Sequence, residues 1–151
     1  MEYSDEQWMK RALKLAKKAE VQGEVPVGAI MIKDSQVIGE GWNHPVSAND
    51  PTAHAEITAM RAASEKLQNY RLPGTTLFVT LEPCTMCVGA MIHARIERLV
   101  FGAYEPKTGA VTSVFNILQS PEYNHRVNFQ GGVLEDECAS LLKDFFQARR
   151  I

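Results

Sequence analysis

An apolar strand, a short helix and a second apolar strand follow one another between residues 76 and 102. Residues 76–81 read Thr-Leu-Phe-Val-Thr-Leu, which is apolar enough for the centre of a sheet. Pro83 suits a helix start because its missing N–H costs nothing there, and residues 84–94 are expected to be helical. Residues 96–102 predict the second strand. Strands joined through so short a helix pair in parallel by a right-handed crossover, which makes this an α/β fold.

The other segments fit around this unit as a single domain of 151 residues, 1–151, with helices on both faces of one sheet. Ser4 and Gln7 form the pattern of a capping box at the start of the first helix. Residues 112–120 are ambiguous. We expect helices over 4–22, 53–67 and 134–149, a hairpin over 25–32 and 37–41, and a strand over 126–129. Asp50 or Thr52 is expected to cap the helix 53–67. The apolar face expected for the helix 134–149 consists of Leu134, Cys138, Leu141, Leu142, Phe145 and Phe146.

The composition excludes several classes of protein. No apolar run approaches the ~20 residues of a membrane span, and the first residues, Met-Glu-Tyr-Ser-Asp-Glu, lack the features of a signal peptide. We therefore expect a cytoplasmic protein with no membrane partner. The formal net charge of −2 is not that of a general nucleic-acid binder, and the basic stretch 10–18 is interpreted as a solvated helix face.

Two short motifs, His54-Ala55-Glu56 and Pro83-Cys84-Thr85-Met86-Cys87, hold residues suited to chemistry. Three cysteines in a reducing compartment argue against a disulfide framework and favour metal binding or catalysis. Cys84 and Cys87 are three residues apart at a helix start, so they point to one face and the helix dipole favours their thiolates. If the helix of His54 starts at the same edge of the sheet, these three residues supply three zinc ligands. The fourth position is then left for water, as in a catalytic site.

Glu56 lies two residues beyond His54, so its side chain points away from the metal but reaches the water bound there. Zinc lowers the pKa of such a water to about 7, which gives a hydroxide nucleophile near neutral pH. A carboxylate within reach can take the proton of that water and deliver it to a substrate. Glu56 is therefore the expected catalytic residue.

A Cys-x-x-Cys motif alone also occurs in redox pairs and in structural zinc sites. A redox pair needs no His-x-Glu motif, and a structural zinc needs a fourth protein ligand. Cys138 lies in an apolar stripe and is interpreted as a core residue, while His93 and His125 stay open as a fourth ligand. His44 precedes a proline in a loop and is interpreted as a surface residue.

Together the two motifs resemble the signature of the zinc-dependent nucleobase deaminases. Within that group the chain is similar, over nearly its whole length, to the bacterial tRNA-specific adenosine deaminases. The resemblance implies the cytidine-deaminase-like fold, a three-layer α/β/α sandwich with a mixed five-stranded sheet. The further blocks that carry it are Glu24-Val25-Pro26-Val27-Gly28-Ala29, Gly41-Trp42-Asn43, Asp50-Pro51-Thr52-Ala53, Thr80-Leu81-Glu82, Lys107-Thr108-Gly109-Ala110, Asn124-His125-Arg126-Val127, Asp136-Glu137-Cys138-Ala139 and Asp144-Phe145-Phe146.

By that resemblance, the chain deaminates the wobble adenosine of a tRNA anticodon to inosine, with a zinc-bound hydroxide as nucleophile and Glu56 as proton shuttle. The resemblance also implies one Zn²⁺ per subunit and a homodimer that binds the anticodon stem-loop. Glu105 stands where the family commonly has aspartate, so a contact there keeps its charge with one more methylene. Substrate contacts are implied for Asn43 (to the flipped base), Pro26 (lining its pocket), Ala55, Glu105, Asn124, His125 and Arg126, and the loops 104–110 and 123–126 are implied to touch the anticodon.

Two other functions stay open from the residues alone. One is deamination of a free nucleobase or nucleotide, of cytosine or guanine type, on the same fold. The other is a structural zinc module without catalysis, which would need a water-free site with four ligands. The zinc motif does not separate an RNA substrate from a small one, and the blocks outside the motif favour RNA.

Overall fold

The structure, a computed structural model, describes residues 2–149 and is built on one mixed sheet. The strands lie in the order β2-β1-β3-β4-β5. They are β1 (Gly28–Lys33), β2 (Gln36–Trp42), β3 (Thr76–Leu81), β4 (Arg98–Ala103) and β5 (Asn128–Gln130). The helices are α1 (Asp5–Val21), α2 (Pro45–Ala48), α3 (Ala55–Leu67), α4 (Thr85–Ala94) and α5 (Glu135–Arg149), with a 3₁₀ turn η1 (Ile117–Gln119).

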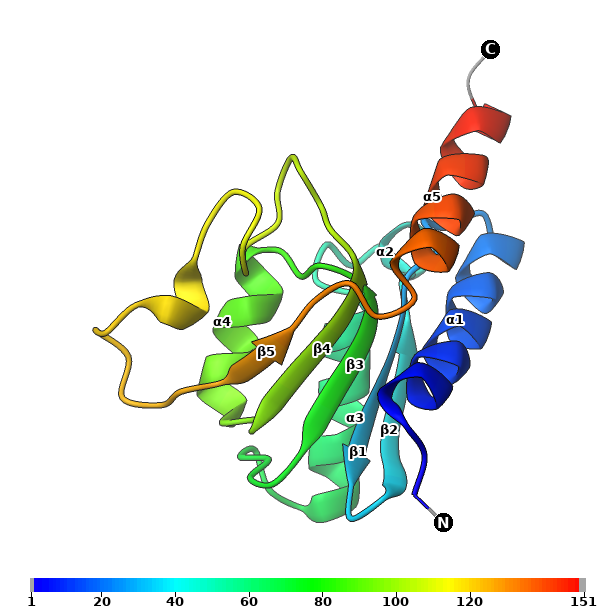
Figure 1. Ribbon diagram of the computed structural model, residues 1–151. Coiled ribbons are helices and arrows are strands. Elements are labelled where there is room, and N and C mark those ends of the chain that lie inside the picture. Colours follow the sequence, from blue (N-terminus) through cyan, green and yellow to red (C-terminus); the bar gives the residue numbers. More distant parts are fainter. Residues whose placement is uncertain (1, 150–151) are drawn as a thin grey trace.

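The sheet changes from antiparallel to parallel at β3. β1 pairs antiparallel with both β2 and β3, whereas β3–β4 and β4–β5 are parallel. The expected hairpin is confirmed, and its two turn residues, Asp34 and Ser35, both have positive φ, as tight hairpin turns require. The parallel pairing of β3 and β4 through α4 is also confirmed. As a result, α3 and α4 both begin at the edge of the sheet where β3 and β4 end (Figure 1).

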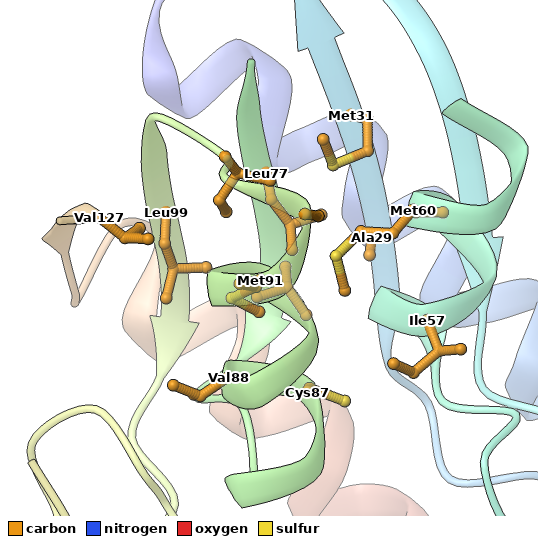
Figure 2. Close-up of a cluster of buried hydrophobic side chains, with 14 of the residues drawn as sticks. Ala29, Met31, Ile57, Met60, Leu77, Cys87, Val88, Met91, Leu99 and Val127 are labelled. Atoms are coloured by element: carbon orange, nitrogen blue, oxygen red, sulfur yellow. The ribbon is translucent and has the colours of Figure 1, made fainter. Parts of the chain in front are cut away.

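Helices cover both faces of the sheet, so the predicted three-layer α/β/α sandwich is confirmed (Figure 1). α1 and α5 pack on one face, and α3 and α4 on the other. Each face has its own apolar cluster. In the cluster under α3 and α4, Figure 2 shows Met91 of α4 and Met60 of α3 pointing inward over Leu77 and Ala29 of the strands.

Helix starts decide where the motif residues lie. Ser4 caps α1 with the predicted capping box. Asp50 and Thr52 do not cap α3, because its first residue is Ala55 and its N-cap is His54. Asp50 instead accepts hydrogen bonds from the Thr52 N–H (2.9 Å) and hydroxyl (2.7 Å), which shapes the loop before the helix. Cys84 is likewise the N-cap of α4, so this helix begins at Thr85, one residue later than predicted.

The C-terminal part departs from the prediction in two places. Cys138 is buried against Gly102, as expected for a core residue, but Phe146 is 47% exposed, so the predicted apolar face is too wide. The ambiguous segment forms turns and the 3₁₀ turn η1. Within residues 2–149, no helix is long and apolar enough to cross a membrane.

Candidate metal centre and active site

His54, Cys84 and Cys87 lie together where α3 and α4 begin. The ligand atoms of the three residues are all within 4.8 Å of one another. His54 Nδ1 is 3.6 Å from Cys84 Sγ and 3.5 Å from Cys87 Sγ. Figure 2 shows Cys87 at the start of α4 with its side chain turned towards α3, where Ile57 lies. The two motifs, 30 residues apart in the chain, therefore form one group of candidate metal ligands. We call this group of His54, Cys84 and Cys87 the metal cluster.

The spacing of this cluster fits a zinc ion. Zn–N and Zn–S bonds of ~2.05 and ~2.3 Å at a tetrahedral angle place nitrogen and sulfur about 3.6 Å apart. The His54–Cys84 and His54–Cys87 distances agree with that value. Within residues 2–149, no further His, Cys, Asp or Glu joins the group, which leaves a fourth position for a non-protein ligand. This donor set therefore suits a catalytic zinc better than a structural one.

Glu56 lies in the first turn of α3, beside the cluster but outside it. Its side chain is only 4% exposed. Burial raises the pKa of the Glu56 carboxyl to about 7, despite the opposing effect of His54. A carboxyl with a pKa near neutrality can both accept and donate a proton at working pH, which is the requirement for general acid–base catalysis.

The two thiols differ in their protonation. The pKa of Cys84 is lowered to about 4, chiefly because the Cys87 thiol hydrogen-bonds to it, with a further contribution from His54. The same hydrogen bond and burial raise the pKa of Cys87. The Cys84 thiolate in turn raises the pKa of His54. The protein's own groups thus hold one thiolate ready, and metal binding releases the proton of the second thiol.

A cavity of about 160 Å³ opens onto the cluster. Its floor holds His54, Glu56 and Cys84, and its walls come from segments that are distant in sequence. The walls are Val25, Val27, Asn43, Leu81, Glu82, Glu105 and Thr108. A molecule in this cavity would lie against the metal cluster and the carboxyl of Glu56 at once.

Comparisons with known proteins agree with this geometry. A family model described as MafB19-like deaminase matches residues 3–150. A tRNA-specific adenosine deaminase of Haemophilus influenzae is 54% identical over 147 residues, which are 97% of this chain and 85% of that protein. This chain belongs to the tRNA-specific adenosine deaminase family. A relative of the same name from Bacillus subtilis is 44% identical over 97% of this chain and 91% of its own length.

Solved structures extend the comparison. A structure from a study of A-to-I editing by tRNA:A34 deaminases at the wobble position of transfer RNA matches with a TM-score of 0.86 and 46% identity, over 89% of this chain and 97% of that one. The guanine deaminase of Nitrosomonas europaea matches with a TM-score of 0.78 and 25% identity, over 94% and 84%. The deaminase fold that the resemblance implied, a three-layer α/β/α sandwich with a mixed five-stranded sheet, is thus confirmed, and a guanine deaminase shares it.

The structure brings some of the predicted substrate contacts to the cavity of this adenosine deaminase family member and leaves others apart. Asn43 and Glu105 line the cavity. Pro26 is buried between two wall residues, Val25 and Val27, and Ala55 is buried at the start of α3. The roles predicted for these four residues stay predictions.

The predicted contacts at 124–126 lie elsewhere. Asn124 and His125 line a separate hollow of about 320 Å³ together with Arg71 and Arg95. The His125 ring nitrogen Nε2 is 2.6 Å from the carbonyl oxygen of Ile96. Arg126 is exposed and donates a hydrogen bond to the Ser120 carbonyl. A substrate that touches these residues and the cluster together must extend well beyond a single base.

Two buried glutamates beside the cavity were missed by the sequence reasoning. Glu24 accepts hydrogen bonds from the backbone N–H groups of Val46 (3.3 Å) and Ser47 (2.6 Å) at the start of α2. Glu82 accepts hydrogen bonds from the backbone of the loop after β4. Burial acts to raise the pKa of Glu82, but hydrogen bonds, above all the one from Ser113, hold that pKa below its usual value. Backbone donors leave no signal in a sequence. Glu82 could have been noticed as a charged residue between an apolar strand and the Pro-Cys motif, whereas Glu24 had no such signal.

Proposed function

We propose that this protein hydrolytically deaminates adenosine to inosine at the wobble position of a tRNA anticodon. The observation that carries the proposal is the cluster of His54, Cys84 and Cys87 at zinc-ligand spacing, with the buried carboxyl of Glu56 lining the same cavity. The substrate comes from the relatives, which are named tRNA-specific adenosine deaminases and cover nearly the whole chain.

In this proposal His54, Cys84 and Cys87 hold one Zn²⁺ per chain, and the ion supplies a water whose pKa is lowered to about 7. Glu56 accepts a proton from the attacking water as its oxygen bonds to C6 of adenine. The same carboxyl then delivers the proton to the neighbouring ring nitrogen. The second proton of the water passes through Glu56 to the amino group, the C6–N bond breaks, and ammonia leaves. Water and adenosine thus give inosine and ammonia.

The roles of the walls follow from their chemistry. The amide of Asn43 can both donate and accept hydrogen bonds, which suits the edge of a flipped base. Val25 and Val27 offer apolar surface to its ring faces. Glu105 lines the same cavity and is proposed to meet the sugar near the target base. Asn124, His125 and Arg126 are proposed contacts for the anticodon loop outside the cavity.

The test is to incubate the protein with total tRNA, an anticodon stem-loop, free adenosine, guanine and cytosine, and to measure inosine and other deaminated products by mass spectrometry. We expect inosine in the RNA substrates alone. Deamination of a free base instead would favour the small-molecule rival, which the likeness to guanine deaminase makes the main alternative. The Glu56→Gln variant should retain zinc and lose turnover, because it keeps the ligands and removes the proton carrier. Undiminished turnover in that variant would refute the role of Glu56.

We further propose a homodimer in the cytoplasm. The surface proposed to meet a second copy is a hollow between α3 and α4, which is lined by Arg61, Ser64, Glu65, Ala90 and Ala94 over the buried Ile57 and Met60. Light scattering should give twice the chain mass of 16.8 kDa, and a single species at the chain mass would contradict the dimer. The three free thiols of the described residues agree with a reducing compartment.

A further inference from the structure

Glu82 is a buried carboxylate that holds the loop following β4. It comes directly after β3 and is 2% exposed. Its Oε2 accepts hydrogen bonds from the backbone N–H groups of Val111 (3.1 Å), Thr112 (2.8 Å) and Ser113 (3.0 Å). Its Oε1 accepts from the Glu105 N–H (3.1 Å) and from the Ser113 hydroxyl. One side chain thus satisfies donors at both ends of the 105–113 loop.

The loop is also packed tightly onto this carboxylate. A Cβ added to Gly109 would lie 2.5 Å from Glu82 Oε1 and from its Cδ, so only glycine fits at that position. The N–H of Ala110 donates to the carbonyl of Pro83 at 2.9 Å. The loop therefore closes over Glu82 and is fixed to the short segment that leads into the metal cluster.

The same loop forms one wall of the cavity. Glu105 and Thr108 line it together with His54 and Cys84 of the cluster, and Lys107, between them in sequence, is exposed. The Glu105 side chain turns back to accept a hydrogen bond from the Lys107 N–H at 3.0 Å. Glu82 therefore holds a loop that forms part of the cavity lining, although Glu82 does not belong to the metal cluster.

We propose that Glu82 is a positioning residue for deamination: its carboxylate holds the 105–113 loop in place so that the loop binds the nucleotides next to the target adenosine in an RNA strand. The inference rests on the proposed function and adds a residue to it. A polar loop with an exposed lysine suits the sugar–phosphate backbone of RNA, whereas a free base would end inside the cavity. A loop that is ordered before the substrate arrives loses less conformational entropy on binding.

This role predicts which kinetic parameter changes. In Glu82→Gln the amide nitrogen takes the place of one carboxylate oxygen. At the Oε1 position this nitrogen faces the N–H of Glu105 and cannot accept its hydrogen bond. The other hydrogen bonds to residue 82 become weaker because the side chain is no longer charged. Loss of one charge-assisted hydrogen bond at the loop corresponds to about a tenfold rise in KM for an anticodon stem-loop. The turnover number should stay near that of the wild type, because His54, Glu56 and the two cysteines are unchanged.

Two further variants keep the inference testable if E82Q does not fold. Ser113→Ala removes one donor at an exposed position and should raise KM in the same direction by less than E82Q does. Gly109→Ala pushes the loop off an intact carboxylate and should match E82Q. Asp5→Asn is the control, because Asp5 pairs with Arg98 at 2.9 and 2.6 Å, far along the chain from the loop. It should lower stability without changing KM.

The decisive experiment combines stem-loop kinetics with hydrogen exchange of the loop amides in all four variants. We expect faster exchange at 105 and 111–113, and a higher KM, in E82Q, G109A and S113A but not in D5N. Faster exchange with an unchanged KM would overturn the inference, as would a fall in turnover alone. The wild type could bind the stem-loop without making inosine, while E82Q binds it more weakly. That result would refute the proposed reaction and support the role of Glu82 in holding the loop. Equal stem-loop binding by the wild type and E82Q would refute the loop role by itself.

Discussion

The contact between Gly41 and helix α3 allows a direct test of how the fold places the metal cluster. Gly41 lies on β2 under the first turn of α3, and a Cβ there would be 2.3 Å from the carbonyl oxygen of Ala55. Gly39, also on β2, lies under the second turn of α3, where a Cβ would be 2.3 Å from the carbonyl oxygen of Ala59. Alanine at either position therefore pushes on the same helix, but only Gly41→Ala pushes on the residue next to His54.

The size of the effect follows from these distances. A close carbon–oxygen contact is about 3.3 Å, so either alanine requires a shift of about 1 Å. Overpacking of this kind costs about 1–3 kcal/mol of folding stability, and we expect that loss in both variants. Ligand–metal distances in a well-formed site lie within about 0.2 Å of their usual values, so a shift of about 1 Å next to His54 is large on that scale. G41A should therefore also lose about 10- to 100-fold in zinc affinity, the range seen when ligand orientation is disturbed.

The assay is urea unfolding for stability, together with zinc affinity by competition with a chromogenic chelator. Gly39→Ala is the matched control, with the same added methyl group, the same helix and a similar loss of stability. If G41A binds zinc as tightly as G39A does, the contact with β2 does not set the position of His54. If neither variant is destabilised, the close approach of α3 to β2 is not a constraint on the fold.

Three further predictions concern the metal, a loop and the core. Removing zinc with a chelator should abolish turnover and lower the melting temperature, and added Zn²⁺ should restore both. Burial acts to raise the pKa of Glu24, but hydrogen bonds from Ser47 and Val46 outweigh it and hold that pKa below its usual value. The charged Glu24 carboxylate therefore stabilises the fold fully above the pKa of about 4.3 that it has in the unfolded chain, and this stabilisation is lost as pH falls through the lower pKa of the folded state. Acid titration should therefore destabilise the wild type more steeply than Glu24→Gln. Met91→Ala should cost about 2–5 kcal/mol in urea unfolding, because its fully buried side chain fills the space between α4 and the sheet (Figure 2).

The metal cluster was predictable because each of its residues follows from a local pattern. Residues 76–81 were predicted as a strand and are β3, since their mixture of leucine, phenylalanine, valine and threonine is apolar enough for the centre of a sheet. The end of that strand fixes where Cys84 and Cys87 lie. His54 required a second helix starting at the same edge, and the alanine-rich run after it supplied that helix.

The surroundings of the cluster were not predictable in the same way. Glu82 and Glu24 bind backbone N–H groups 20 or more residues away, and every residue except proline offers such a donor. Residues 112–120 have no periodicity: Thr112 and Ser113 are held by the Glu82 carboxylate, most of the others are exposed, and Leu118 alone of this segment is buried in the apolar core. The apolar face predicted for α5 was also too wide, since Phe145 is buried but its neighbour Phe146 is exposed.

His54 and Cys84 occupy the two helix positions where a side chain ordinarily binds the helix's own free N–H groups, yet neither makes such a bond. An ion shared by both residues would instead act as a clasp between α3 and α4, closing a loop of 30 residues. In a chain-entropy treatment, a cross-link of that length contributes on the order of 3–4 kcal/mol. With such an ion bound, a variant without the Glu56 carboxyl would therefore still gain stability from the histidine and both cysteines, so the ion would fasten the two helices whether or not the protein is active.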